Sequence, residues 1–308
     1  MKYRVGIDLG GTSAKIACVT GGWKIVRETS VSTSGFPNSG DLARRISFAI
    51  KDMLGKDQAE RIGIGVAGDI DPDRGVIRIS PNLGWKNVPL KKLFQRHFNC
   101  PIFVENDANA AGWGVYKTQA PKNISNVIVM TLGTGVGGGI ILNGRLYRGA
   151  TGSAGEIGHM NIAEKGPLCN CGNRGCLETY VGGPHLIKKV RSGLGRGVKS
   201  SLQAQFRENP AEITPYLIAQ AARRGDRYSQ SIWEGVGHAL GLAIGDLVYI
   251  LNPQMIFFTG GIAQAGPLIL GPLWRTLRQR AFKTPVNAVS IKVAREASHI
   301  GVLGAALL

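Results

Sequence analysis

Acidic residues are scarce in this sequence. Its 308 residues include 20 Asp and Glu against 37 Lys and Arg, so the formal net charge is +17 although only 19% of the residues are charged. Most of the excess lies after Asp107, where there are 21 basic and 9 acidic residues. Net charge reports on partners rather than on fold. The excess predicts an anionic partner: nucleic acid, an acidic membrane surface, or a phosphorylated or polyanionic substrate.

An apolar leader segment is also missing. Lys2, Arg4 and Asp8 leave no room for the hydrophobic part of a signal peptide, so we expect the chain to start inside its fold. Residues 247–274 carry no charge and are long enough to raise the question of a membrane span, but three prolines and a glycine pair interrupt them. The stretch predicts a buried strand with turns, and we expect a cytoplasmic protein with no membrane partner.

Cysteine is too rare and too unevenly spaced for a disulfide framework. There are five, an odd number, and Cys169, Cys171 and Cys176 lie within eight residues. His159 precedes them, and one imidazole with three thiolates can close a tetrahedral zinc site. Four protein ligands leave no open position, so the zinc would be structural and would hold the loop of residues 156–178. The alternative, a redox Cys-x-Cys pair, has the wrong spacing for Cys-x-x-Cys and leaves His159 unused.

Apolar residues, by contrast, make up 44% of the chain. At about 100–200 residues per domain, this length predicts two globular domains, with a boundary near the polar stretch 117–123. Gly237, Gly241 and Gly245 recur every four residues in one expected helix, which predicts close packing of its backbone against a neighbour. Apolar residues at helical spacing predict helices over residues 42–54, 90–98, 108–116, 229–251 and 300–308, and buried strands over 61–67 and 102–104.

Two glycine-rich turns, each between two apolar β-type segments, form an internal repeat. The first is DLGGT at 8–12 and the second, about 125 residues later, is LGTGVGGG at 132–139. The second contains G-x-G-x-x-G, but a strand follows it instead of a helix, and no acid lies about 20 residues on, so it is not a dinucleotide fingerprint. The pattern predicts two related α/β halves and phosphate-binding hairpin turns; plain tight turns are the alternative. The residues concerned are Gly10, Gly11, Thr12, Gly133, Thr134 and Gly135.

Two aspartates are candidates for chemistry beside these turns. Asp8 ends a strand next to the first turn, which suits a Mg²⁺ ligand, with turn capping as the alternative. Asp107, in ENDAN at 105–109, lies where a strand gives way to a helix, the usual place for a site in an α/β layer. Its alternative is a helix N-cap, a role open to Asn106 or Asp107, and the residues alone favour this alternative.

The motifs in their order resemble the ROK family of sugar kinases along the whole chain. DLGGT and LGTGVGGG resemble its phosphate motifs, ENDAN its catalytic motif, and TGG at 259–261 its adenosine-side motif. GEIGH at 155–159 and CNCGNRGCLE at 169–178 resemble its sugar-binding and zinc motifs. The resemblance implies an α/β, actin-like (ribonuclease H-like) fold with an interdomain cleft. It implies a smaller domain over 1–117 and a larger one over 118–297 with a zinc loop at 159–176, while a helix at about 298–308 packs back on the first.

The resemblance also implies the role of each matching residue. Asp107 would be the general base that takes the proton from a sugar 6-hydroxyl as that hydroxyl attacks the γ-phosphorus of ATP. His159 would bind zinc with one ring nitrogen and face the sugar with the other. The implied sugar-binding residues are Asn82, Asn106, Asp107, Glu156, His159 and Glu178. The implied ATP- and phosphate-binding residues are Asp8, Gly10, Gly11, Thr12, Gly133, Thr134, Gly135, Gly260 and Gly261. The implied metal ligands are Asp8 for Mg²⁺ and His159, Cys169, Cys171 and Cys176 for zinc.

The substrate is expected from a more local likeness. Residues 81–90 resemble the glucokinases of the family, which implies glucose and ATP as substrates and a homodimer or higher homo-oligomer. Mannose, fructose, N-acetylglucosamine or N-acetylmannosamine kinases, a polyphosphate-using gluco- or glucomannokinase, and an inactive sugar sensor are the alternatives. Family repressors carry an N-terminal helix-turn-helix for which Asp8 lies too close to Met1, so no specific nucleic acid is expected. The basic runs at 188–227 and 275–295 are interpreted as solvated helix faces, or else as a polyphosphate track.

Overall fold

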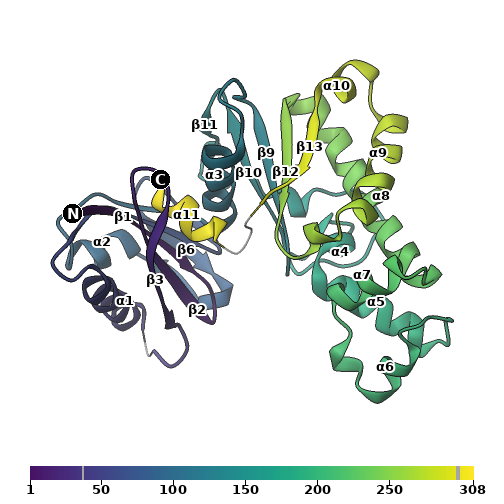
Figure 1. Ribbon diagram of the computed structural model, residues 1–308, viewed down its shortest axis with the longest axis horizontal. Coiled ribbons are helices and arrows are strands. Elements are labelled where there is room, and N and C mark those ends of the chain that lie inside the picture. Colours follow the sequence, from purple (N-terminus) through teal and green to yellow (C-terminus); the bar gives the residue numbers. More distant parts are fainter. Residues whose placement is uncertain (37, 296–298) are drawn as a thin grey trace. The chain divides into compact units, whose positions relative to one another are not determined.

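The computed structural model describes residues 1–36, 38–295 and 299–308 (Figure 1). By its internal packing the chain forms two compact units, which we describe separately. Unit 1 consists of Met1–Val129, Gly139–Gly155 and Arg295–Leu308; unit 2 consists of Met130–Gly138 and Glu156–Ala294. This division differs from a boundary at residue 117, because residues 118–129 and 139–155 go with unit 1. A Cβ at Gly112 would lie 2.9 Å from Cα of Gly139, so the helix that carries Gly112 packs tightly on this part of the chain.

The first sheet contains the predicted N-terminal hairpin. Its strands β1 and β2 are antiparallel, with Ile7 opposite Ile16, and β4 and β8 then add in parallel. Three parallel strands therefore end at one edge of the sheet, which positions the residues that follow them. The order is β3-β2-β1-β4-β8, with bounds β1 (Lys2–Leu9), β2 (Ser13–Val19), β3 (Ile25–Ser32), β4 (Gln58–Val66) and β8 (Ile102–Asn106).

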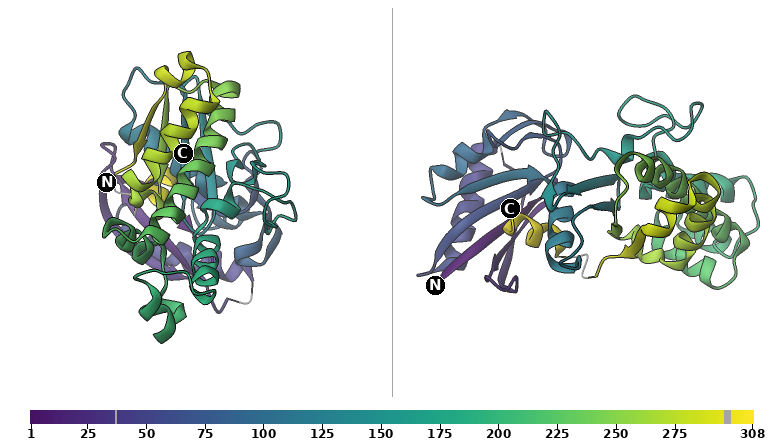
Figure 2. Two further views of the ribbon diagram at one scale, coloured as in Figure 1. Left: turned by 90° about the vertical axis from the view of Figure 1, so that its right-hand side faces the viewer. Right: turned by 90° about the horizontal axis from the view of Figure 1, so that it is seen from above.

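The helices of unit 1 were mostly predicted from apolar spacing. The C-terminal helix α11 lies against the sheet (Figure 1 and the right-hand view of Figure 2), and a Cβ at Gly63 of β4 would come within 1.8 Å of the Ala305 carbonyl oxygen. Helix α2 ends earlier than predicted, because the N–H groups of His97 and Phe98 both turn back to the Phe94 oxygen. The elements are α1 (Ser39–Leu54), α2 (Leu90–Gln95), α3 (Asp107–Gln119), α11 (Ile300–Ala306), and a small antiparallel sheet of β5 (Asp69–Asp71), β6 (Val76–Ser80) and β7 (Trp85–Val88) joined by a 3₁₀ turn η1 (Pro81–Leu83).

The second sheet repeats the first. Its order β11-β10-β9-β12-β13 matches β3-β2-β1-β4-β8 position by position, with β10/β11 antiparallel like β2/β3 and β12/β13 parallel like β4/β8. All five residues of β12 are buried, which confirms the buried strand predicted within 247–274. The repeat of two glycine turns thus marks two sheets of one design. Their bounds are β9 (Val127–Leu132), β10 (Val136–Leu142), β11 (Arg145–Leu146), β12 (Met255–Thr259) and β13 (Ser290–Val293).

Close packing of two helices dominates unit 2. A Cβ at Gly237 of α8 would lie 2.5 Å from the Ile269 oxygen of α9, and one at Gly241 2.6 Å from Cβ of Thr276, so the glycine stripe is a packing surface as predicted (Figure 1). Of the described residues, only α8 is long and apolar enough to cross a membrane, and 56% of its most apolar window is buried inside the protein. The helices are α4 (Glu178–Val181), α5 (Gly183–Gly195), α6 (Gln203–Glu208), α7 (Pro215–Arg223), α8 (Arg227–Leu251), α9 (Pro267–Arg280) and α10 (Lys283–Ala288), with 3₁₀ turns η2 (Ile157–His159), η3 (Pro210–Glu212) and η4 (Ile262–Ala265).

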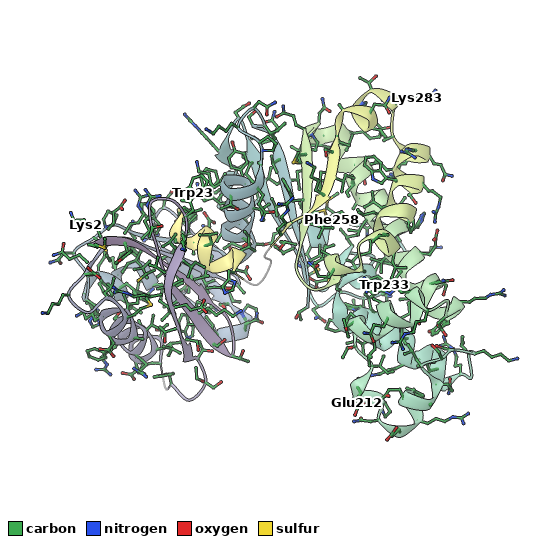
Figure 3. The ribbon with its side chains drawn as sticks, viewed as in Figure 1. Lys2, Trp23, Glu212, Trp233, Phe258 and Lys283 are labelled. Atoms are coloured by element: carbon green, nitrogen blue, oxygen red, sulfur yellow. The ribbon has the colours of Figure 1, made fainter. Side chains whose placement is uncertain are left out.

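The two basic runs lie on exposed surface. Eight of the nine basic residues in 188–227 and all six in 275–295 are exposed. Figure 3 shows Lys283 and Glu212 pointing away from the ribbon, whereas Trp233 and Phe258 lie inside. Some of this charge is paired locally, since Arg280 of α9 donates to Asp246 of α8 at 2.8 Å. The exposure fits the interpretation of these runs as solvated helix faces.

Candidate functional site

The first glycine turn lies beside Asn82. Gly10 N–H donates to the Ser13 oxygen at 3.0 Å and closes the turn between β1 and β2, leaving Thr12 exposed at its tip. A Cβ at Gly11 would lie 2.9 Å from the Asn82 carbonyl oxygen, so only glycine permits this close approach of η1. The fold therefore brings together a backbone-lined turn and an amide side chain that are 71 positions apart in the sequence.

Asp8, the next-to-last residue of β1, lies in a confined place. A Cβ at Gly301, in the first turn of α11, would lie 2.7 Å from the carboxylate Oδ2 of Asp8. Burial raises the pKa of Asp8, and the positive charge of Lys15 opposes that shift. Burial disfavours the charged carboxylate, and a bound cation would restore it. A carboxylate in this position is chemically suited to a hard cation such as Mg²⁺.

Asn106, not Asp107, caps helix α3. Its Oδ1 accepts the N–H groups of Ala108 at 2.9 Å and Asn109 at 3.1 Å, and its Nδ2 donates to the Gly68 oxygen at 3.1 Å. Asp107 is the first residue of α3, and its Oδ1 also accepts from Ala108 N–H at 2.9 Å. The capping alternative for Asp107 therefore falls away, because its neighbour already performs that role.

Asp8 and Asp107 lie at the same edge of the first sheet. In the register, Asp8 is opposite Gly65 of β4, and Gly65 is opposite Glu105 of β8. Neighbouring strands are about 4.8 Å apart, so one row of the sheet separates Asp8 from Glu105 by about 10 Å, with Asp107 two residues beyond. This edge holds the carboxyl ends of the parallel strands, where α/β sheets place their ligands.

Glu105 is a functional candidate that the sequence did not single out. It is 1% exposed, and its carboxylate accepts from Asn106 N–H, from Nδ2 of Asn109, and from Nε of Arg148. Its only signal in the sequence was an acid closing an apolar strand, next to Asn106 and Asp107. The partner Arg148 is 43 positions away and could not be found from local pattern.

The second glycine turn rests on Glu178. Oε2 of Glu178 accepts Val136 N–H at 2.9 Å, and a Cβ at Gly135 would lie 2.4 Å from that oxygen. Gly133 N–H donates to the Gly135 oxygen at 3.0 Å, which closes the turn and leaves Thr134 exposed. Gly260 follows β12 with φ +94°, and a Cβ there would lie 2.4 Å from the Leu132 oxygen. The Gly260-Gly261 turn therefore lies directly against the base of the second glycine turn.

Glu156 precedes the short turn η2, and His159 is the last residue of that turn. The Nε2 of His159 lies 3.9 Å from Oε2 of Glu156, and His159 N–H donates to the Glu156 oxygen at 3.0 Å. The Nδ1 of the same ring lies 3.7 Å from Sγ of Cys169. One imidazole thus has one nitrogen at the cysteine cluster and the other beside an acid that is more than half exposed.

The cysteine cluster fits a tetrahedral metal ion. The ligand atoms of His159, Cys169, Cys171 and Cys176 all lie within 4.8 Å of one another, and Sγ of Cys171 is 3.7 Å from Sγ of Cys176. Two sulfurs bound to one zinc at about 2.3 Å and tetrahedral angles are about 3.8 Å apart. The donors therefore have the chemistry and the spacing of a closed zinc site.

A cation bound at the cluster would change the protonation of its thiols. Burial, with hydrogen bonds to the neighbouring thiols, raises the pKa of Cys176 to about 12, whereas a backbone hydrogen bond from Asn173 lowers the pKa of Cys171. Cys176 would thus stay protonated at neutral pH without a positive charge beside it. A zinc ion supplies that charge and converts coordinating thiols to thiolates.

Comparison with known proteins decides the family. Residues 4–308 match the profile of the ROK family. The chain belongs to the ROK family. A glucokinase from Thermotoga maritima is 33% identical over 303 residues, which cover 98% of this chain and 95% of that enzyme. A ROK family glucokinase from Streptomyces griseus, crystallised with glucose and AMPPNP, has a TM-score of 0.82 and 31% identity and covers 99% of this chain and 98% of its own.

Repressors of the same family match less of their own length. A xylose repressor from Caldicellulosiruptor bescii is 36% identical over 243 residues, which are 79% of this chain and 60% of the repressor. The glucokinases match end to end. The fold class predicted from the sequence is confirmed: this ROK chain has the mixed α/β, actin-like fold of the family's sugar kinases.

Proposed function

We propose that this ROK chain is an ATP-dependent glucokinase that transfers the γ-phosphoryl group to the 6-hydroxyl of glucose. The observation that carries the proposal is Asp107, an acid at the carboxyl edge of parallel strands whose capping role is taken by Asn106. End-to-end similarity to glucokinases supports the same reaction.

In this reaction Asp107 accepts the proton of the sugar hydroxyl while the hydroxyl oxygen forms its bond to the γ-phosphorus and ADP leaves. Phosphoryl transfer asks mainly for orientation and charge stabilisation, so one positioned carboxylate suffices as the base. The N–H groups of Gly10 and Gly133 close the two glycine turns, so the N–H groups of Gly11, Thr12, Thr134 and Gly135, with the two threonine hydroxyls, would hold phosphate oxygens. Asp8 would hold the Mg²⁺ that accompanies ATP, and Gly260-Gly261 would lie on the adenosine side.

The proposed sugar-binding residues are Asn82, Asn106, Glu156, His159 and Glu178. Asn106 keeps one amide N–H for a sugar hydroxyl, since its other N–H donates to Gly68 and its oxygen caps α3. Zinc held by His159, Cys169, Cys171 and Cys176 would fix the orientation of the imidazole toward the sugar.

The substrate is tested by a panel of hexoses. With ATP as donor we expect glucose to have the highest kcat/KM, by at least about tenfold over mannose, fructose, N-acetylglucosamine and N-acetylmannosamine, because a mismatched hydroxyl leaves buried polar groups unpaired. Initial rates from a coupled ADP assay measure this. A higher value for mannose or an N-acetylhexosamine would contradict glucose as substrate while keeping the kinase. No turnover of any hexose would favour a sugar sensor.

Polyphosphate belongs in the same panel as a second donor. The exposed basic residues of 188–227 and 275–295 are the observation that favours it. If they guide a polyanion, turnover with polyphosphate falls steeply with added salt, because each neutralised phosphate releases counterions. Lack of polyphosphate-driven turnover at low salt would dispose of this second candidate.

Asp8→Asn is expected to stabilise the protein and to impair it as a kinase. Because burial raises the folded pKa of Asp8 above its ordinary value of 3.8, the folded state binds more protons than the unfolded state between those two values, and stability falls as pH rises through that window. Asparagine removes this penalty, so the melting temperature at pH 7 should rise while kcat with Mg²⁺-ATP falls by about tenfold or more.

The matched control is Asp52→Asn, an exposed acid on α1, which should change neither quantity. Thermal melts at pH 4 and pH 7, with kcat at saturating ATP, decide the matter. A lower melting temperature at pH 7, or an unchanged kcat, would contradict the placement of Asp8.

A further inference from the structure

The carboxylate of Glu105 is buried beside Asp107 and has no role in the reaction as proposed. Glu105 is the next-to-last residue of β8, and 1% of its surface is exposed. One oxygen, Oε1, accepts Asn106 N–H at 3.0 Å and Nδ2 of Asn109 at 3.1 Å; both donors flank Asp107. Glu105 thus holds the junction of β8 and α3 by hydrogen bonds to one residue before and one residue after the proposed base, Asp107.

The other oxygen of Glu105 is held by Arg148. Nε of Arg148 donates to Oε2 at 2.5 Å, and the arginine side chain is 40% exposed. A buried carboxylate without a cationic partner is strongly unfavourable, and Arg148 is the cationic partner that the structure provides for Glu105. The pair joins the catalytic motif to a distant part of the chain.

Arg148 begins a short segment, 148–155, that runs directly into Glu156. A second arginine holds the same segment elsewhere: Nη2 of Arg78 donates to the Thr151 oxygen at 2.7 Å, and Nη1 donates to Asp69 at 2.8 Å. Ser153 also donates to Asp69, at 3.0 Å. Segment 148–155, which belongs to unit 1, is therefore held within that unit by Arg148 and by the Arg78–Asp69 group, and of these two attachments only Arg148 touches the catalytic motif.

We propose that Glu105 and Arg148 are a positioning pair for the phosphoryl-transfer step, holding Asp107 at the orientation in which it accepts the sugar proton. The inference rests on the proposed kinase function and names no new contact with substrate. Glu105 sets the β8–α3 junction through Asn106 and Asn109, and Arg148 sets Glu105. Without the pair, the carboxylate of Asp107 would shift from the position in which it accepts the sugar proton. A shift of about 1 Å in a catalytic group can lower the rate by up to about 100-fold, even when the mutated residue is remote from the reacting atoms.

Arg148→Met tests the pair. We expect kcat to fall by about tenfold or more while KM for glucose changes less than about threefold, because Asn82, Glu156, His159 and Glu178 remain. Arg148→Lys keeps the charge but loses the planar fork, so it should recover part of kcat. Glu105→Gln should lose kcat like Arg148→Met, and the double variant should be no worse than the poorer single variant, because both changes remove one interaction.

Arg78→Met is the matched control. Arg78 is as exposed as Arg148, has an acidic partner and holds the same segment, but does not touch Glu105. We expect its kcat to stay within about threefold of the unchanged protein. An equal loss in Arg78→Met would overturn the inference, since the effect would then come from a loosened segment. A normal kcat in Arg148→Met, or a double variant whose loss is the product of the single losses, would overturn it as well.

Hydrogen exchange separates this inference from the proposed function. The amides of Asn106, Ala108 and Asn109 are held by the junction, so peptides covering 102–112 should exchange faster in Arg148→Met than in Arg78→Met or the unchanged protein. This readout needs no turnover. If the unchanged protein phosphorylates no hexose, the kinase proposal fails, and the exchange comparison still shows whether Glu105 and Arg148 hold the β8–α3 junction.

Discussion

Replacing Asp107 by asparagine is expected to lower kcat for glucose phosphorylation by about 10²–10⁴-fold, the range that a positioned general base contributes. Asparagine has the shape of aspartate and can still accept the Ala108 N–H that Asp107 accepts at 2.9 Å. The amide cannot take the hydroxyl proton. The variant therefore removes the base and little else, and initial rates at saturating glucose and ATP measure the loss.

Stability and sugar binding should survive this change, because Asn106 supplies the cap of α3. The melting temperature should stay close to that of the unchanged protein, and the dissociation constant for glucose, measured by calorimetry, should change only a few fold. Asp41→Asn is the matched control, since Asp41 also lies in the first turn of a helix, α1, and it should leave kcat unchanged. A kcat within threefold for Asp107→Asn would refute its assignment as the base.

Local pattern was enough to predict the parts of the fold that are built from neighbouring residues. The hairpin β1–β2 follows from an apolar strand, a glycine turn and a second apolar strand, and β9–β10 repeats it. The glycines spaced four residues apart in α8 likewise predict the close packing of this helix against a neighbour, which is α9. The zinc candidates come together because His159 and Cys176 are only 17 positions apart and the loop between them is short.

Contacts between distant segments could not be predicted in this way. Arg148 and Glu105 are 43 residues apart in the sequence, and Arg78 and Thr151 are 73 apart. The residues near each arginine in the sequence do not indicate which partner it contacts. The assignment of 139–155 to unit 1 has the same origin, because it depends on what that segment packs against. Asn82 came only from family resemblance; its place beside the first turn depends on the close approach of η1 to Gly11.

Removing a cysteine of the cluster is expected to have the second large effect. Cys176→Ser should abolish stoichiometric zinc, because three ligands remain of a closed four-ligand site and Cys176 is fully buried. KM for glucose should rise and kcat/KM fall by about 10–100-fold or more. The cluster is connected to the proposed sugar-binding residues in two ways. Cys176 lies two residues before Glu178, whose carboxylate accepts the Val136 N–H of the second glycine turn. His159 has one ring nitrogen near Cys169 and the other near the carboxylate of Glu156.

The control and the readouts make this prediction decisive. Cys100→Ser removes a partly buried cysteine outside the cluster and should retain both zinc and activity. Metal analysis of the purified proteins, thermal melts and glucose kinetics are measured together. A zinc-free Cys176→Ser protein with a normal KM for glucose would show that the loop holds Glu156, His159 and Glu178 without metal. Loss of zinc with a raised KM, in a protein that still melts cooperatively, would show that the ion acts on the sugar site by orienting His159 and Glu178 rather than by keeping the whole chain folded.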